Sequence, residues 1–229
     1  MTNEENKGDH LQRLEHIKQV LLGIRNVNQL IVTENDPRRL VERACVNLTE
    51  TMGYLNTWIA LVGGEAARGL GLPDAGPVAR AAAAGFDGGF KVLRERLERG
   101  AFPECMKRAL ESADTFVKND PAADCTDCPL HGEYEERAGL TRRLEFDGVT
   151  YGTLTASVPA AYADDAEEQD LFNEVADDLA FALHKISSAR RLRESRNDLK
   201  RAQALAHVGS WRFDLNTGKV IASEETRRI

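Results

Sequence analysis

The stretch LTRRLEFDGVTYGTLTASV, residues 140–158, decides the fold. Apolar and polar side chains alternate on both sides of an Asp-Gly pair at 147–148, the pair that a type I′ turn favours, so the stretch predicts a β-hairpin. Gly152 lies inside the second strand and predicts a bulge or a close approach of another backbone. Each strand has one apolar side, formed by Leu140, Leu144 and Phe146 in the first and by Leu154, Ala156 and Val158 in the second.

A long helix follows the hairpin, with Asp164 or Asp165 as its N-cap. Beyond Ile186 the helical pattern continues to Ala206 but becomes densely charged, which is typical of an exposed or paired helix. At ~1.5 Å per residue the whole helix would extend ~60 Å. We therefore expect a connector helix over residues 187–206. The inner face of the preceding part consists of Leu171, Val175, Leu179, Ala182 and Ile186.

A second amphipathic helix is expected over residues 11–35, after a disordered tail over residues 1–10. Two interpretations of its apolar stripe are open. A single Asn in such a stripe sets the register of paired helices, which would make this helix half of a dimer interface. Alternatively, the helix packs on its own domain. The stripe consists of Leu14, Ile17, Leu21, Ile24, Asn28 and Ile31.

The residues between these helices predict an α+β fold. Asp36 caps a helix whose first residue is Pro37. This order implies one antiparallel sheet with helices on one face and small elements on the other. The expected elements are a helix over 36–52, a strand over 54–62, a loop over 65–77, a strand over 78–86, helices over 87–100 and 103–110, a strand over 115–118 and a polar loop over 119–129.

Composition narrows the class of protein. The chain has 229 residues, 42% of them hydrophobic, and a formal net charge of −7, which argues against nonspecific nucleic-acid binding. Its apolar runs are too short for a membrane span, and its polar start is unlike a signal peptide. Four cysteines do not make a disulfide scaffold in a chain of this length. We therefore expect a cytoplasmic protein without a nucleic-acid partner.

Three stretches resemble known families. Residues 140–158 followed by YADDAEEQDLFNEVADDLAFAL resemble the closing half of a GAF domain, and NDPRRLVERACVNLTETMGYLNTWIALV resembles its opening helix and first strand. The tail RAQALAHVGSWRFDLNTGKVIASEETRRI is similar to the first hairpin of a PAS domain. This combination is typical of bacterial and archaeal sensor histidine kinases, with diguanylate cyclases as another host. The expected organisation is a tail over 1–10, a helix over 11–35, a GAF-like sensory domain over 36–186, a connector over 187–206 and the truncated start of a PAS-like domain over 207–229.

The resemblance implies a regulatory module rather than an enzyme. GAF domains hold a small ligand or cofactor between the sheet and the small covering helices, and they dimerise through their first and last helices. A homodimer through the N- and C-terminal helices is therefore expected, with a PAS domain and an output domain further along the same chain. The residue set of cyclic-nucleotide binders is missing, and Cys128 is followed by Pro129 instead of the His of bilin binders, so both ligands are disfavoured. The alternative is a thiol enzyme resembling GAF-type methionine-sulfoxide reductases, which would use Cys125 and Cys128.

The segment DCTDCPLH, residues 124–131, carries the chemistry, and four interpretations of it are open. Cys125 and Cys128 can form a redox pair, although Asp124 and Asp127 would raise the thiol pKa values. A cysteine or His131 can ligate haem, with His184 less favoured. The cysteines can also merely line a pocket. Finally, zinc or another soft metal can bind a set that needs a further cysteine from elsewhere in the fold: Cys105, Cys125, Cys128 and His131.

Further candidates have an ordinary structural explanation beside the functional one. Arg80 and Arg142 can pair with an anionic ligand or face solvent, and the second is favoured. His207 lacks the acidic neighbour of a phosphorylated histidine and is interpreted as structural, and Cys45 is expected in the core. Six aromatic residues line a ligand cavity or belong to the core: Tyr54, Trp58, Phe86, Phe90, Phe102 and Tyr151.

Overall fold

The fold is given by a computed structural model that describes residue 18 and residues 21–228. The chain divides into two compact units, Met1–Ser187 and Ser188–Ile229. This division lies next to residue 186, where the sequence places the end of the GAF-like domain. The expected tail over residues 1–10 lies outside the described residues.

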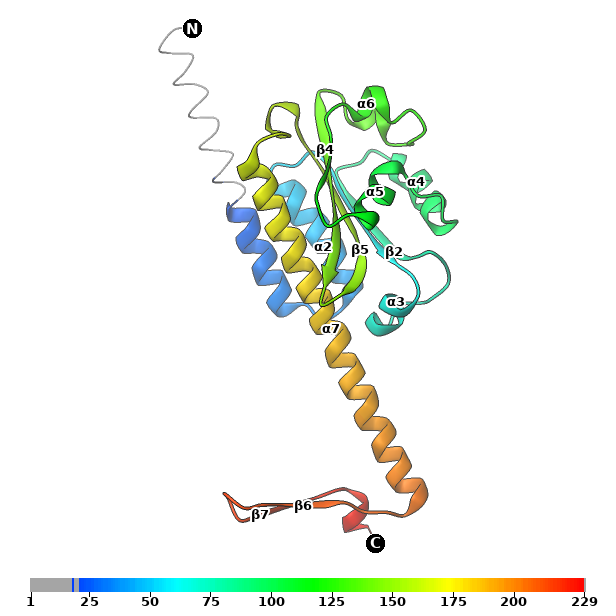
Figure 1. Ribbon diagram of the computed structural model, residues 1–229, viewed down its shortest axis with the longest axis vertical. Helices are drawn as coiled ribbons and strands as arrows, with labels where there is room; N and C mark the ends of the chain where they lie inside the picture. Colours follow the sequence, from blue (N-terminus) through cyan, green and yellow to red (C-terminus); the bar gives the residue numbers. More distant parts are fainter. Residues whose placement is uncertain (1–17, 19–20, 229) are drawn as a thin grey trace. The chain divides into compact units, whose positions relative to one another are not determined.

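A five-stranded antiparallel sheet forms the centre of the first unit (Figure 1). Its strand order is β2-β1-β5-β4-β3, so the hairpin predicted from residues 140–158 supplies two of the three inner strands. The predicted fold class, an antiparallel sheet with helices on one face and a long C-terminal helix, is confirmed. The strands are β1 (Thr57–Val62), β2 (Val78–Ala84), β3 (Phe116–Lys118), β4 (Arg137–Phe146) and β5 (Val149–Pro159).

The β4–β5 hairpin has the features that its sequence predicts. Asp147 and Gly148 both have positive φ, as a type I′ turn requires. The register shifts by one residue opposite Gly152, which marks a β-bulge. A Cβ atom at Gly152 would lie 1.9 Å from the carbonyl oxygen of Ala60 in β1. Glycine therefore permits both the bulge and the close approach of β1.

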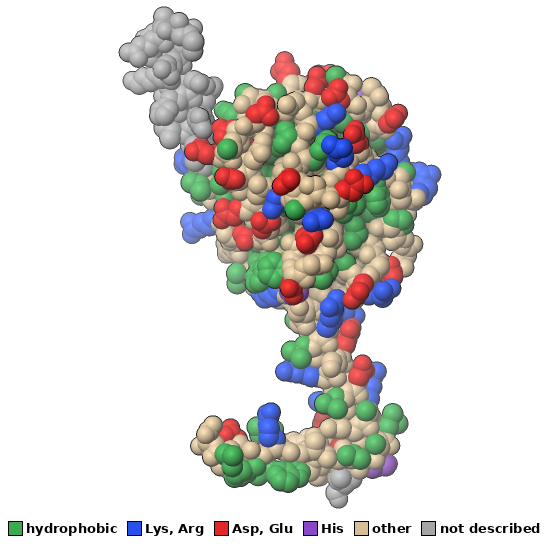
Figure 2. All heavy atoms as spheres, in the orientation of Figure 1, with side chains coloured by type: hydrophobic (Ala, Val, Ile, Leu, Met, Phe, Trp, Pro, Cys, Tyr) green, Lys and Arg blue, Asp and Glu red, His purple; other side chains and the backbone are tan. Residues whose placement is uncertain are grey.

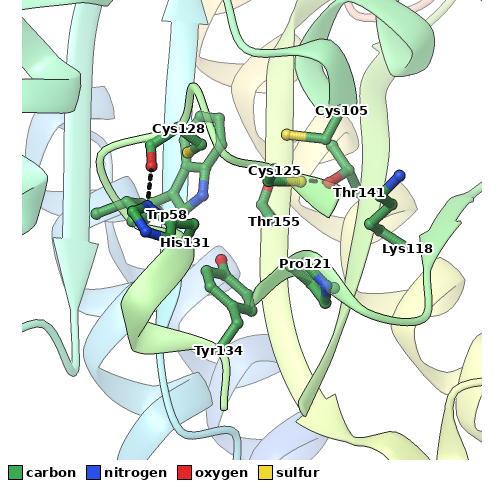
Figure 3. A pocket seen from close by; sticks show the side chains of 12 residues that line it. Trp58, Cys105, Lys118, Pro121, Cys125, Cys128, His131, Tyr134, Thr141 and Thr155 are labelled. Carbon is green, nitrogen blue, oxygen red and sulfur yellow. Dashed lines mark hydrogen bonds between the residues drawn. The ribbon is translucent and has the colours of Figure 1, made fainter. Parts of the chain in front are cut away.

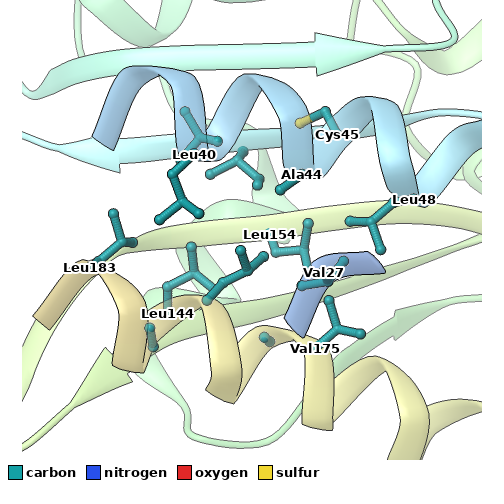
Figure 4. Packing of buried hydrophobic residues seen from close by; sticks show 14 of the residues in the cluster. Val27, Leu40, Ala44, Cys45, Leu48, Leu144, Leu154, Val175 and Leu183 are labelled. Atoms are coloured by element: carbon teal, nitrogen blue, oxygen red, sulfur yellow. The ribbon is translucent and has the colours of Figure 1, made fainter. Parts of the chain in front are cut away.

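Three helices cover one face of this sheet: the helix over residues 21–33, α2 (Pro37–Glu50) and the first part of α7 (Ala166–Ala206). Asp36 caps α2 by accepting a hydrogen bond from the Arg38 backbone N–H at 2.8 Å. Figure 4 shows Leu40 and Leu48 of α2 facing Val175 and Leu183 of α7 across the side chains of the hairpin. These residues form the main hydrophobic core of the unit.

Cys45 lies within this core, as expected. Its side chain is completely buried on α2, and its thiol donates to the Ala82 carbonyl oxygen of β2 at 3.6 Å. Burial raises the pKa of this thiol to about 12. Cys45 is therefore an unreactive core residue in the folded protein.

The helix over residues 21–33 packs on its own domain. Ile24 and Ile31 of the expected stripe are buried in the core, together with Val27 and Leu30. Asn28 is exposed, and so is Leu21. Leu14 and Ile17 lie outside the described residues.

The opposite face carries smaller elements and a second apolar cluster around Trp58 (Figure 1). Residues 65–77, expected as a loop, contain a short helix instead. The Glu-Ala-Ala start of this helix outweighs the Gly and Pro residues that follow, and Gly71 ends it in the left-handed conformation. The elements between β1 and β4 are α3 (Glu65–Leu70), α4 (Gly89–Glu98), α5 (Glu104–Glu111), α6 (Pro121–Asp124) and the 3₁₀ turn η1 (His131–Glu133), while η2 (Ala160–Tyr162) follows β5.

The second unit contains the last part of α7 and a separate hairpin, β6 (Trp211–Asp214) and β7 (Lys219–Ala222), followed by η3 (Glu225–Arg227). Every side chain from residue 188 to residue 202 is exposed, and Lys and Arg outnumber the acidic residues Glu194 and Asp198 there (Figure 2). His207 ends the helix with positive φ, and its Nδ1 lies 3.5 Å from the Glu225 carboxylate. None of the described helices has an apolar stretch long enough to cross a bilayer.

Candidate functional site

Three cysteines line one small cavity between the sheet and its covering elements (Figure 3). Cys105 comes from α5, whereas Cys125 and Cys128 come from the segment between α6 and η1. The cavity has a volume of about 30 Å³, which is room for one or two water molecules. Its remaining lining is mostly apolar and consists of Trp58, Lys118, Pro121, Leu130, His131, Tyr134, Gly139, Thr141 and Thr155.

Consecutive turns hold the two neighbouring cysteines at the cavity. Asp120 caps α6 by accepting from the Ala123 backbone N–H at 3.0 Å. The Cys128 N–H then donates to the Cys125 carbonyl oxygen at 2.8 Å. The Cys128 carbonyl oxygen in turn contacts Nδ1 of His131 at 2.8 Å. This segment brings Cys125 and Cys128 beside Cys105, which lies twenty or more positions earlier in the chain.

A groove of about 350 Å³ lies on the outer side of the same three cysteines. The thiols therefore form part of the wall between the groove and the inner cavity. The groove is more polar than the cavity, because Arg96, Glu104, Lys107 and Asp127 line it.

Burial governs the pKa values of these thiols. It raises the pKa of Cys105 to about 12, with a further increase from the neighbouring Cys128 and Cys125. Burial also raises the pKa of Cys125, and the Lys118 ammonium opposes this shift. Asp124 raises the pKa of Cys125 as expected, but less than burial does. Burial raises the pKa of Cys128 too. All three thiols are therefore mainly protonated at neutral pH, which makes them slow nucleophiles.

The structure places the six aromatic candidates in different parts of the domain. Trp58 lines the cavity, and Phe102 lines the groove. Phe90 is buried beside the cavity cluster and stacks on Phe86 with ring centroids 5.8 Å apart. Tyr54 and Tyr151, expected as possible cavity residues, lie instead in the main core on the other face of the sheet.

The other polar candidates also lie away from the cysteines. His184 contacts the Tyr151 hydroxyl at 3.2 Å, on the α7 side of the sheet. Arg80 pairs with Glu42 of α2, and Arg142 pairs with Asp177 of α7 at 3.0 Å. Neither arginine lines the cavity or the groove.

Sequence reasoning missed Lys118 and Tyr134, which border the cavity. The Lys118 ammonium pairs with the Asp124 carboxylate at 3.0 Å. It is also the charge that lowers the pKa of Cys125 the most. Burial raises the pKa of Tyr134 well above its ordinary value. The position of Lys118 at the end of a short predicted strand could have indicated that it borders the site. Nothing in the sequence around Tyr134 indicates that it does.

The cysteine site does not have the geometry of a metal centre. Within residues 21–228, no three His, Cys, Asp or Glu side chains are arranged to hold a metal ion. The set Cys105, Cys125, Cys128 and His131, expected as metal ligands, is therefore not assembled as one. The cavity of about 30 Å³ is also far smaller than a haem macrocycle.

Comparison with known proteins identifies the fold. No protein-family model and no curated protein matches the sequence. Among solved structures, the GAF domain of A. aeolicus nlh2 in an inactive state aligns with a TM-score of 0.52 at 10% identity, over 76% of this chain and 99% of that one. The chain has the fold of a GAF domain.

Two further GAF domains agree. The GAF domain of the phosphoenolpyruvate-protein phosphotransferase ptsP from Coxiella burnetii aligns with a TM-score of 0.52 at 13% identity, covering 75% of this chain and 96% of that one. The corresponding Acinetobacter domain gives 0.51 at 11% identity, with coverages of 82% and 97%. At these identities the GAF likeness extends to the fold alone.

Proposed function

We propose that this chain is a sensory GAF module of a signal-transduction protein and that its cysteine cavity senses oxidants. One observation carries the proposal: Cys105, Cys125 and Cys128 lie on a common cavity wall that also borders an outer groove. The site lies between the sheet and the small covering helices. An oxidant can therefore reach thiols whose state affects the packing of these covering elements.

The raised thiol pKa values count against the alternative, a thiol enzyme of the methionine-sulfoxide-reductase kind. A catalytic cysteine needs a thiolate near neutral pH. Burial raises the pKa of Cys105 and of Cys125 instead. A sensor tolerates slow chemistry, because it needs one event for each signal rather than repeated turnover.

We further propose that α7 relays the signal, in a homodimer that pairs through the N- and C-terminal helices. Phe172, Leu179 and Leu183 anchor the first part of α7 in the core, and the same helix continues to Ala206. Leu192 and Leu199 are exposed apolar residues on the continuation, which suits pairing with a second copy. For the relay to switch, the oxidised site must favour a different arrangement of α7 from the reduced site. The proposed receiver is a PAS domain followed by a kinase or cyclase output.

Treatment of the reduced protein with hydrogen peroxide is expected to remove two free thiols per chain, and dithiothreitol is expected to restore them. Free thiols are counted with a chromogenic disulfide reagent under denaturing conditions after anaerobic purification. An absorption spectrum and metal analysis of the same sample test for another occupant. A Soret band, stoichiometric metal, or four thiols that persist in excess peroxide would contradict oxidant sensing. Reductant-dependent sulfoxide reduction that is lost in Cys125→Ser would favour the enzyme.

The alkylation of Cys125 is expected to accelerate with pH beyond ~8.5, where an ordinary thiol is already half ionised. The sign follows from its raised pKa, because the reactive thiolate forms only as pH rises through that value. Lys118→Met removes the cation that lowers this pKa and should slow alkylation at a given pH. Lys107→Met is the matched control, since Lys107 lines the groove but is not among the main causes of the Cys125 pKa shift. Site-resolved mass spectrometry measures both rates, and equal slowing by the two variants would contradict the assigned role of Lys118.

A further inference from the structure

We propose that oxidation joins Cys105 of α5 to Cys125 in the α6–η1 segment, rather than closing the neighbouring Cys125 and Cys128 pair. This inference rests on the proposed function, since it names the bond through which the cavity would register an oxidant. It gives the third cysteine, which belongs to no sequence motif, a chemical role.

The positions of the side chains favour this pair. In Figure 3 the sulfurs of Cys105 and Cys125 lie in the same part of the cavity, above Thr141, whereas Cys128 lies over Trp58. Cys105 forms a side-chain hydrogen bond with Thr141, whose hydroxyl is 3.1 Å from that of Thr155. Cys128 and Cys125 both raise the pKa of Cys105, Cys128 more strongly, so all three thiols lie near one another and the choice of pair rests on the side-chain positions.

Cys128 is held in a different way. Its backbone N–H and carbonyl oxygen are both engaged in the turns that run from Cys125 to His131, and its side chain packs on the apolar cluster around Trp58. A bond between Cys125 and Cys128 would close a turn that the 2.8 Å backbone hydrogen bond already closes. Such a bond would change little beyond the turn itself.

Cys125 is the thiol that reacts first in this scheme, because it is the least buried of the three, it borders the outer groove, and the Lys118 ammonium opposes the rise of its pKa. Its thiolate attacks one oxygen of a hydroperoxide, and the O–O bond breaks to give a sulfenic acid and a hydroxide that takes up a proton. The Cys105 sulfur then attacks the Cys125 sulfur, the S–S bond forms and the hydroxyl leaves as water with the Cys105 proton. Two thiols lose two electrons, and hydrogen peroxide is reduced to two molecules of water.

The bond would tie α5 to the α6–η1 segment, and the chain that follows α5 contacts α7. The Ala113 carbonyl oxygen accepts from Arg142 at 3.1 Å, and Arg142 pairs with Asp177 of α7. The Thr115 hydroxyl donates to the Asn173 side chain of α7 at 2.5 Å. A constraint on α5 therefore acts on an element whose end is held against the relay helix.

Three cysteines allow three bonds. Peptide mapping separates a bond to Cys105 from a bond between Cys125 and Cys128, because trypsin cuts between Cys105 and Cys125 but not between Cys125 and Cys128. The Cys128→Ser variant separates the two bonds to Cys105, since a linked peptide that is lost in this variant would identify Cys128 as the partner and overturn the inference. Reduced wild type, Cys105→Ser and Cys128→Ser are treated with hydrogen peroxide, alkylated and digested. We expect GAFPECMK (residues 100–107) to be linked to NDPAADCTDCPLHGEYEER (residues 119–137) in wild type and in Cys128→Ser, with no linked peptide in Cys105→Ser. Circular dichroism melting confirms that each variant is folded.

The outcomes separate this inference from the proposed function. A bond inside residues 119–137 that forms in wild type and persists in Cys105→Ser would overturn the inference and leave oxidant sensing intact. The absence of any bond in all three folded proteins would overturn both.

Hydrogen exchange tests the proposed effect on α7. Oxidation is expected to slow amide exchange over residues 173–186 in wild type and Cys128→Ser but not in Cys105→Ser. Unchanged exchange in oxidised wild type would contradict the coupling to α7.

Discussion

Trp58→Ala is expected to lower the free energy of unfolding of the first unit by about 3–5 kcal/mol, the range for removing a fully buried aromatic side chain. Trp58 lies in β1, an inner strand of the sheet, and only 1% of it is exposed. It packs against Phe90, Leu93 and Met106 and forms the base of the cysteine cavity, so truncation leaves a void that the rigid sheet cannot fill. Urea denaturation followed by circular dichroism measures the loss.

The matched control is Trp211→Ala. Trp211 is 69% exposed in the separate β6–β7 hairpin, so its removal should change unfolding of the first unit by less than about 0.5 kcal/mol. Trp58→Phe keeps part of the packing and should lose less than Trp58→Ala, which keeps the test informative if the Ala variant does not fold. Similar effects of the two Ala substitutions would show that Trp58 is not the core residue described here.

Gly152→Ala is expected to destabilise the domain by about 3 kcal/mol, at the upper end for overpacked cores. The added Cβ would lie 1.9 Å from the Ala60 carbonyl oxygen and 2.9 Å from the Leu61 Cα, both backbone atoms of the neighbouring strand. Two paired inner strands, β1 and β5, must therefore move apart. The melting temperature should fall by about 6–12 °C, since about 1 kcal/mol shifts it by about 2–4 °C in a domain of this size.

Gly132→Ala is the control for this change. Gly132 lies in η1, and a Cβ there meets no atom within 4 Å, so this variant should melt within a few degrees of wild type. A Gly152→Ala protein as stable as Gly132→Ala would mean that β1 does not approach the bulge closely.

Local signals in the sequence predicted the sheet well. The Asp-Gly pair at 147–148 and the alternation around it are sufficient to specify a hairpin, because turn type and side-chain period are properties of neighbouring residues. Asp36 and Pro37 likewise specified the start of α2. The short helix at Glu65–Leu70 was missed because six residues are too few for a periodic pattern.

The cavity was harder to predict, because alternation shows which residues share a face only while the strand is regular. Tyr54 precedes β1, which begins at Thr57, so the parity of β1 does not extend to it. The bulge opposite Gly152 reverses the parity of β5, so Tyr151 points to the core while Thr153 and Thr155 keep the other side. No short-range pattern reports such an inversion.

The sequence predicted some of the residues that come together at the cysteine site from distant parts of the chain. The Cys-x-x-Cys spacing marked the segment at 125–128, and the structure brings Cys105 beside it, as a shared site requires. The dominance of burial in the thiol pKa values was not accessible, because it depends on what the folded chain places around each sulfur. Charged neighbours such as Asp124 are visible in a sequence, whereas the amount of surrounding protein is not.

The buried thiol of Cys45 can serve as an internal probe of whether the core is folded. Its sulfur lies on the buried face of α2 and can react with a water-soluble reagent only when the core opens. The rate at which Cys45 is labelled therefore reports how often the core of the domain opens, separately from reactions of the cysteines near the surface. If the other three cysteines react while Cys45 remains unlabelled, the hydrophobic core has stayed folded during the reaction.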